Sequence, residues 1–125
     1  MNKYLVIAAL VVAGLFIMGF GGGKSDLVSY EELQAKLAQK ENLVLLDVRT
    51  QEEFAEGHIA GAVLLPYDEI EQKVANLLPE KDKPIIVYCR SGRRSAIAAK
   101  SLRGLGYKDV RDFGGISRWQ GNLER

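Results

Sequence analysis

The sequence of 125 residues predicts an α/β domain, a parallel sheet with helices on both faces, preceded by an apolar N-terminal segment. Three short apolar runs, at 43–46, 62–65 and 85–88, have the length and continuity of strands buried on both faces. Segments with helical spacing or helix-capping residues alternate with these runs. Strands that alternate with helices predict a parallel sheet, because parallel neighbours need a crossover connection.

Capping residues and helix breakers set the expected boundaries of the other elements. Ser29 with Glu32, and Thr50 with Glu53, have the spacing of capping boxes, and the second predicted helix ends at Gly57. The expected helices and strands outside the three apolar runs are helices at 29–39, 50–56 and 68–77, a helix at 95–105 that Ser95 can cap, a strand at 109–113 and a last helix at 116–123.

Residues 1–23 are predicted to be a membrane anchor or a signal segment. The stretch 4–23 contains no charged residue and, as a helix, is long enough to span a bilayer core of about 30 Å. Its length favours an uncleaved anchor over a cleaved signal. Lys3 before the stretch predicts a cytoplasmic N-terminus, which would place the domain on the extracytoplasmic (periplasmic) side. Residues 24–28 then form a linker to a domain at 29–125.

Composition excludes several classes of site. One Cys cannot form an intramolecular disulfide, and one Cys with one His cannot assemble the usual zinc site. The sequence predicts no cofactor, since Gly23-Lys24-Ser25 lacks both the earlier glycine and the preceding strand of a phosphate-binding P-loop. Residues 24–88 have a net charge of −6 and residues 89–125 a net charge of +6. With a pI near 7.8, this asymmetry predicts a site for a small anion rather than for nucleic acid.

The strongest candidate site follows the third apolar run. Cys89 stands at the expected carboxyl end of a strand, where α/β sheets bind ligands, and a helix is expected to begin a few residues later. Loop N–H groups, the helix N-terminus and arginines would bind an anion and favour the nucleophilic thiolate of Cys89. The residues expected to bind the substrate in this cysteine loop (residues 89–95) are Arg90, Ser91, Gly92, Arg93, Arg94 and Ser95.

The chain resembles a single rhodanese domain. The motifs that carry the resemblance are Asp47-Val48-Arg49 with Glu53, Gly57-His58-Ile59 with Gly61-Ala62, the cysteine loop, Gly106-Tyr107 with Val110, and Gly114-Gly115-Ile116 with Trp119. The resemblance implies a parallel five-stranded sheet flanked by helices. It also implies that Cys89 takes the outer sulfur of thiosulfate, or of a similar donor, as a persulfide and passes it to a thiol or to cyanide.

The other motif residues are interpreted as structural. Asp47 and Arg49 would end a strand, with Arg49 paired to Glu53 across the turn. His58 is expected to be a hydrogen-bonded packing residue, and Trp119 to pack the last helix on the core. The carboxylates expected to form a solvated helix face rather than a metal site are those of Glu52, Glu53 and Glu56.

Two alternatives to a thiosulfate sulfurtransferase stay open. One is a persulfide-carrying, sulfur-relay module that docks on a protein partner and turns over small molecules slowly. The other is phosphatase or arsenate chemistry, as in dual-specificity phosphatases of the same fold. Those enzymes have an arginine six positions after the cysteine, whereas this chain has Ser95 there and Arg94 one position earlier.

Overall fold

The computed structural model describes residues 26–125, so the predicted anchor or signal segment at 1–23 lies outside the described residues. Within the described part of the chain, no helix is long and apolar enough to cross a membrane. The elements, in chain order, are α2 (Tyr30–Ala38), β1 (Val44–Asp47), α3 (Gln51–Glu56), β2 (Val63–Leu64), η1 (Tyr67–Glu69), α4 (Ile70–Leu77), β3 (Ile85–Cys89), α5 (Arg93–Gly104), β4 (Val110–Gly115) and η2 (Ile116–Arg118), where η marks a 3₁₀ turn.

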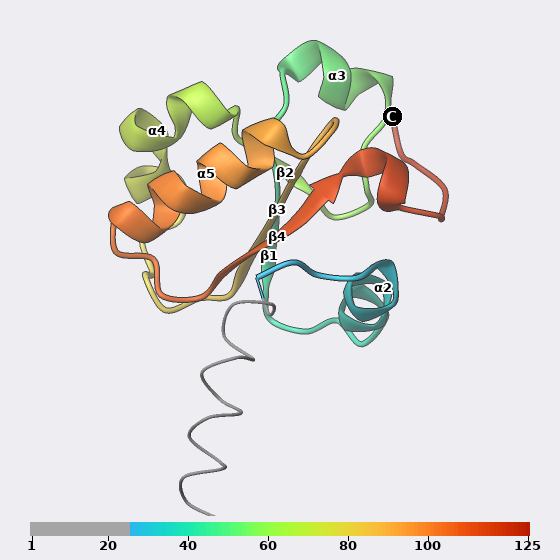
Figure 1. The fold of residues 1–125 in the computed structure, drawn as a ribbon, viewed down its shortest axis with the longest axis horizontal. Coiled ribbons are helices and arrows are strands. Elements are labelled where there is room, and N and C mark those ends of the chain that lie inside the picture. The colour runs from blue at the N-terminus through green and yellow to red at the C-terminus, as the bar shows by residue number, and fades with distance from the viewer. Residues whose placement is uncertain (1–25) are drawn as a thin grey trace, which may run out of the picture.

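The strands form a parallel sheet in the order β2-β1-β3-β4, which confirms the predicted α/β class. α4 and α5 cover one face and α2 the other, while α3 lies beyond the carboxyl end of the strands (Figure 1). Alternate side chains of β3 enter different cores: Val87 packs towards α4 and α5, and Ile86 and Tyr88 pack towards α2. The central strands are therefore continuous apolar runs because both of their faces are covered.

Among the described residues the sheet has four strands, not the five that the resemblance implies. The fifth position is reduced to a single bridge between Leu27 and Asp112 beside β4. Asp112 donates its N–H to Asp26 and accepts the N–H of Val28, and the chain then enters the Ser29 cap of α2. No further ladder can form because α2 begins immediately.

β2 is also shorter and more exposed than predicted. It has two residues at the edge of the sheet, and Val63 is 38% exposed. The apolar run at 62–65 is therefore an edge strand with only one neighbour, β1, rather than a strand buried on both faces.

Two predicted helices differ in the structure. The helix expected at 68–77 begins as η1 and becomes regular only at Ile70. The helix expected at 116–123 stops after the single turn of η2 because Trp119 adopts an extended backbone. Beyond it, Glu124 pairs with His58 in an antiparallel bridge, so this segment binds back onto the domain instead of continuing the helix.

The predicted caps are partly confirmed. Thr50 and Glu53 form the complete capping box at α3, with the Thr50 side chain accepting the Glu53 N–H and the Glu53 carboxylate accepting the Thr50 N–H. At α2, Ser29 accepts the Glu32 N–H, but the Glu32 carboxylate binds Arg111 instead of returning to the cap. Arg111 is a stronger partner for the carboxylate than a neutral N–H.

Candidate active site

β3 delivers Cys89 to the carboxyl end of the sheet, where the sequence places it. The side chain is fully buried and belongs to the core under α5. Its sulfur accepts a hydrogen bond from the Gly92 N–H at 3.0 Å. Gly92 has φ +107°, a left-handed conformation that other residues adopt only with strain, and this turn aims its N–H back at the sulfur. The cysteine loop therefore folds over its own thiol.

Helix α5 starts at Arg93, two residues earlier than predicted, directly after Gly92. Ser95 is consequently not the cap. It lies buried in the first turn and donates its hydroxyl to the Gly92 carbonyl at 3.1 Å. The twelve residues of α5 place the positive end of the helix dipole next to the Cys89 sulfur. The expected helix N-terminus is thus next to the cysteine, and Ser95 stabilises the turn at Gly92 instead of capping the start of the helix.

The end of β4 makes room for the cysteine loop. A bulge after Val87 brings Gly115 opposite Cys89 in the strand register. A Cβ on Gly115 would lie 2.7 Å from the Arg90 carbonyl oxygen and 3.1 Å from the Ser91 Cα. Only glycine allows this approach of two backbones. In the sequence, the Gly114-Gly115 pair is recognised only as part of the family motif. The one sign of close backbone packing there is that the two glycines directly follow a predicted strand.

The three arginines of the loop have different surroundings. Arg90 and Arg93 are exposed and form no ion pair among residues 26–125. Arg94 is mostly buried and donates to both carboxylate oxygens of Glu53, at 2.7 and 2.9 Å. The hydrogen bonds to Glu53, first, and the negative charge of Glu53 raise the pKa of Arg94. Arg94 lies in the first turn of α5, two residues after the Gly92 that binds the Cys89 sulfur. The two exposed arginines are the cations available to an incoming anion.

Glu53 was predicted to pair with Arg49 and to lie on a solvated face, and both predictions are wrong. Its carboxylate is 16% exposed and binds Arg94 and Thr50. Hydrogen bonds from Arg94, and then from Thr50, lower the pKa of Glu53 to about 2. Its role as the partner of Arg94 was missed because the capping box already accounted for a glutamate at that position.

Arg49 instead binds Asp47 and the end of α3. Its guanidinium donates to the Asp47 carboxylate at 2.7 Å and to the Gly57 carbonyl at 2.6 Å. Beside this ion pair, the buried Tyr88 hydroxyl accepts the Ile59 N–H at 3.1 Å. Burial, and next the charge of Asp47, raise the pKa of Tyr88, so its hydroxyl stays neutral. This network supports β3 one residue before Cys89, in agreement with the structural role predicted for Asp47 and Arg49.

His58 and Trp119 lie in packing positions. His58 stacks on Phe54, with ring centroids 3.7 Å apart, and its Nδ1 lies 2.9 Å from the Phe54 carbonyl oxygen. This confirms the packing role predicted for the histidine. Trp119 meets Tyr30 edge to face at a centroid distance of 5.2 Å. It packs against the core on the α2 side, although the helix expected to carry it is absent.

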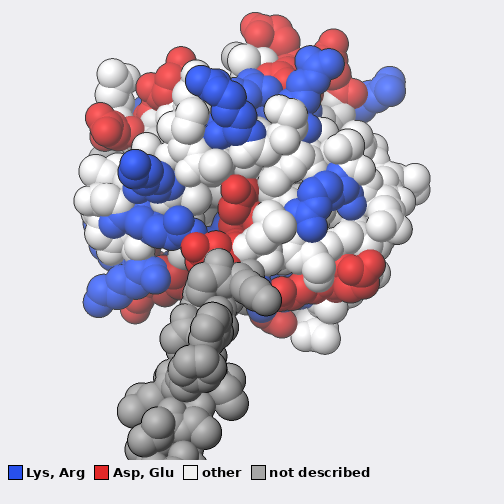
Figure 2. Space-filling model, in the orientation of Figure 1, with Lys and Arg blue, Asp and Glu red and all other residues white. Residues whose placement is uncertain are grey.

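Three of the nine basic residues of the C-terminal third form ion pairs with acidic residues from earlier in the chain. Arg94 binds Glu53, Arg103 lies 3.6 Å from Asp26, and Arg111 binds Glu32. On the face shown in Figure 2, Lys and Arg are interspersed with Asp and Glu and form no continuous basic patch. Ion pairing across the fold therefore accounts for part of the sequence asymmetry. At the cysteine loop, the positive charge left without an acidic partner among residues 26–125 comes from Arg90 and Arg93.

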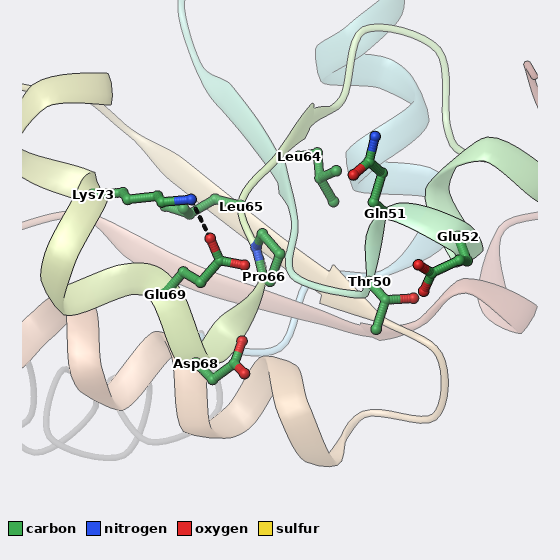
Figure 3. Close-up of a pocket in the computed structure, with 9 residues that line it drawn as sticks. All are labelled: Thr50, Gln51, Glu52, Leu64, Leu65, Pro66, Asp68, Glu69 and Lys73. Atoms are coloured by element: carbon green, nitrogen blue, oxygen red, sulfur yellow. Dashed lines mark hydrogen bonds and ion pairs between the residues drawn. The ribbon is translucent and has the colours of Figure 1, made fainter.

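A separate groove of about 460 Å³ lies beside β2, between α3 and η1 (Figure 3). Its lining residues are Thr50, Gln51, Glu52, Leu64, Leu65, Pro66, Asp68, Glu69 and Lys73. It contains no residue of the cysteine loop, and Lys73 pairs with Glu69 at its rim. Its acidic lining does not suit an anionic substrate.

The fold and the cysteine loop together define the class of protein. The Rhodanese-like domain family matches residues 29–122, and the chain belongs to this family. Its relatives include a sulfurtransferase of Allochromatium vinosum, 38% identical over 93 residues, which cover 74% of this chain and 85% of that protein. The thiosulfate sulfurtransferase PspE of Escherichia coli is 35% identical over 71 residues, 57% of this chain and 68% of that one.

Other relatives differ in length, and solved structures agree with the fold. YrkF of Bacillus subtilis is 40% identical over 98 residues, but this chain spans only 52% of its length. The human single-domain sulfurtransferase TSTD1 superposes with a TM-score of 0.67 and 32% identity, over 75% of this chain and 94% of that one. The similarity covers the described domain. In TSTD1 it covers nearly the whole of the related chain.

Proposed function

We propose that this rhodanese-like protein is a sulfurtransferase that carries sulfane sulfur as a persulfide on Cys89, with thiosulfate or a related anion as the donor. The observation that carries the proposal is the Cys89 sulfur at the end of β3, with the Gly92 N–H at 3.0 Å and the N-terminus of α5 beside it. Such donors stabilise a negatively charged sulfur, both as the attacking thiolate and as the persulfide.

The reaction consists of two displacements at sulfur. The Cys89 thiolate attacks the outer sulfur of thiosulfate; a new S–S bond forms, and the donor's S–S bond breaks with its electron pair leaving on sulfite. A thiolate or cyanide then attacks the outer persulfide sulfur, and Cys89 leaves as a thiolate. Because sulfite is a good leaving group, neither step needs a general acid. This fits a site in which the one histidine of the chain serves in packing.

Arg90 and Arg93 are assigned to attraction of the anionic donor. Both are exposed at the mouth of the cysteine loop, whereas Arg94 is neutralised by Glu53. Replacing Arg90 or Arg93 by alanine should raise the KM for thiosulfate by about 3- to 10-fold, the effect of one unit charge on an exposed anion. Lys100→Ala, which removes an exposed charge further along α5, is the matched control and should leave the KM within about twofold. Unchanged KM values in both arginine variants would exclude this role.

The persulfide-carrier alternative is favoured by one observation, the complete burial of the Cys89 side chain. A loop that closes over the sulfur could discharge its persulfide only when a protein partner moves it. Kinetics with a small acceptor separate the two functions: an enzyme turns over repeatedly with cyanide, whereas a carrier keeps its persulfide in cyanide and loses it to one protein thiol. The oxyanion-ester alternative has less support, since Arg94 is five positions after Cys89 and already bound to Glu53.

We also propose that residues 1–23 anchor or export the protein, so that the domain works on the extracytoplasmic side. The proposal rests on the uncharged stretch at 4–23 and on Lys3 before it. Cell fractionation followed by protease treatment of intact spheroplasts tests it. An anchor predicts a protease-sensitive domain in the membrane fraction, and export after cleavage predicts the domain in the released extracytoplasmic fraction. Recovery of the whole chain in the soluble cytoplasmic fraction would refute both.

A further inference from the structure

An ion pair joins α3 to the cysteine loop, and the role assigned to it here rests on the function proposed above. The Arg94 guanidinium is held on two nitrogens by Glu53, at 2.7 and 2.9 Å, and the two side chains are only 21% and 16% exposed. A bidentate pair of this kind fixes orientation as well as charge. Arg94 therefore cannot turn freely towards an anion at the cysteine.

Glu53 is itself fixed. Its Oε1 accepts the Thr50 N–H at 3.1 Å and lies 3.2 Å from the Thr50 hydroxyl, while its own N–H binds Thr50 in return. The carboxylate is thus part of the capping box that starts α3, and it cannot follow Arg94 if the arginine moves. The pair links the start of α3 to the first turn of α5, where the Cys89 sulfur is bound.

This arrangement has a consequence for anions at the site. Both the donor thiosulfate and the leaving sulfite are anions, so every uncompensated positive charge near Cys89 strengthens the binding of substrate and of product. Arg94 lies in the first turn of α5, two residues after Gly92, whose N–H binds the Cys89 sulfur at 3.0 Å, so its guanidinium is near enough to act on an anion held at that sulfur. The Glu53 carboxylate cancels most of that effect.

We propose that Glu53 is a positioning residue that holds the Arg94 guanidinium beside Cys89 and, by neutralising it, limits the affinity of the cysteine site for anions. Arg90 and Arg93 attract the donor at the mouth of the loop, and the neutralised Arg94 lets sulfite leave. Glu53 is thus a determinant of substrate and product affinity, although it does not touch the reacting sulfur.

Sulfate titrations of the full-length chain test the proposal, with the Gly92 amide resonance as the readout at low, constant ionic strength. The chains compared are wild type, E53Q, R94M, E53Q/R94M and, as a matched loss of one exposed α3 carboxylate, E52Q. E53Q should lower the Kd for sulfate roughly fivefold, which corresponds to about 1 kcal/mol of charge interaction at a site accessible to water. R94M should raise the Kd by a similar factor. The double variant and E52Q should stay within about twofold of wild type.

The opposite directions of the two single variants distinguish positioning from structural support. Both variants break the same ion pair, so a merely structural pair would change the Kd in the same direction in both, or not at all, and either result overturns the proposal. If E53Q does not fold, as judged by its amide spectrum, R94M and the double variant decide the outcome. The Kd of the double variant for sulfate must then be about fivefold lower than the Kd of R94M.

Persulfide formation in the wild-type chain is measured separately, by mass, after treatment with thiosulfate. If no persulfide forms but the Kd for sulfate falls in E53Q and rises in R94M, the proposed function fails and the role of Glu53 in anion affinity stands. If a persulfide forms and the Kd values are unchanged, the inference about Glu53 is wrong and the sulfurtransferase proposal stands. The expected result is a persulfide together with opposed changes in Kd.

Discussion

Gly115 offers the sharpest perturbation of the cysteine loop that leaves every charged group in place. In Gly115→Ala the new Cβ would lie 2.7 Å from the Arg90 carbonyl oxygen, whereas ordinary contacts begin near 3.4 Å. The difference of about 0.7 Å must be taken up by backbone, because the Ser91 Cα is also within 3.1 Å and no flexible side chain can yield. The loop is therefore expected to move away from β4.

The expected cost has two parts. Overpacking of this kind destabilises a fold by about 1–3 kcal/mol. Displacement of reacting groups by close to 1 Å lowers rates by about 100-fold, and here the displaced group is the Gly92 N–H that binds the Cys89 sulfur. We expect kcat/KM for transfer from thiosulfate to cyanide to fall by about that factor, while the variant stays folded at 25 °C.

Gly104→Ala is the matched control. Gly104 lies at the end of α5, has no positive φ, and a Cβ there meets nothing within 4 Å. Alanine should stabilise this helix by about 0.5–1 kcal/mol and leave kcat/KM unchanged. Steady-state kinetics and urea unfolding of both variants check the prediction. A Gly115→Ala enzyme with wild-type kcat/KM would show that close backbone contact does not set the loop geometry.

Two further predictions concern stability. Ionised Glu53, with its pKa lowered to about 2 from the ordinary 4.5, stabilises the fold fully above pH 4.5, and this stabilisation is lost as the pH falls towards 2. The free-energy gap between wild type and E53Q, about 1–3 kcal/mol at pH 7, should therefore shrink between pH 4.5 and 2 in urea titrations; a gap independent of pH would contradict this. Tyr88→Phe removes the acceptor of the buried Ile59 N–H and should cost about 1–3 kcal/mol. Tyr67→Phe, whose hydroxyl has no hydrogen bond within the described residues, should change stability by less than about 0.5 kcal/mol. Equal losses in the two phenylalanine variants would assign the effect to packing.

Much of the fold could be predicted because its signals are local. The apolar run before Cys89 is long enough to mark a strand buried on both faces, and the spacing of Thr50 and Glu53 marks a helix start. The cysteine, the glycine of the turn and the following helix are contiguous in sequence, so the core of the site could be recognised without knowledge of tertiary contacts.

The features that could not be predicted depend on distant partners. The choice of Glu53 between Arg49 and Arg94 is decided by the fold, which gives Arg49 the nearer Asp47 and the Gly57 carbonyl. The edge position of β2 depends on strand order, and an apolar run carries no information about which neighbours it has.

The prediction of a last helix at 116–123 was wrong for a related reason. The segment 116–123 has apolar residues at helical spacing, yet after η2 the chain pairs Glu124 with His58. A tertiary bridge replaces the continued helix, and it is formed between residues far apart in sequence.

The central claim is that Cys89 carries transferable sulfur, and mass spectrometry of the intact chain after treatment with thiosulfate and then with cyanide tests it most directly. We expect a gain of one sulfur atom located on Cys89, its removal by cyanide, and no gain in Cys89→Ser, which should remain folded because it keeps the size of the side chain. No gain in the wild-type chain, with the thiol still open to alkylation after unfolding, or a gain that persists in Cys89→Ser, would contradict the account.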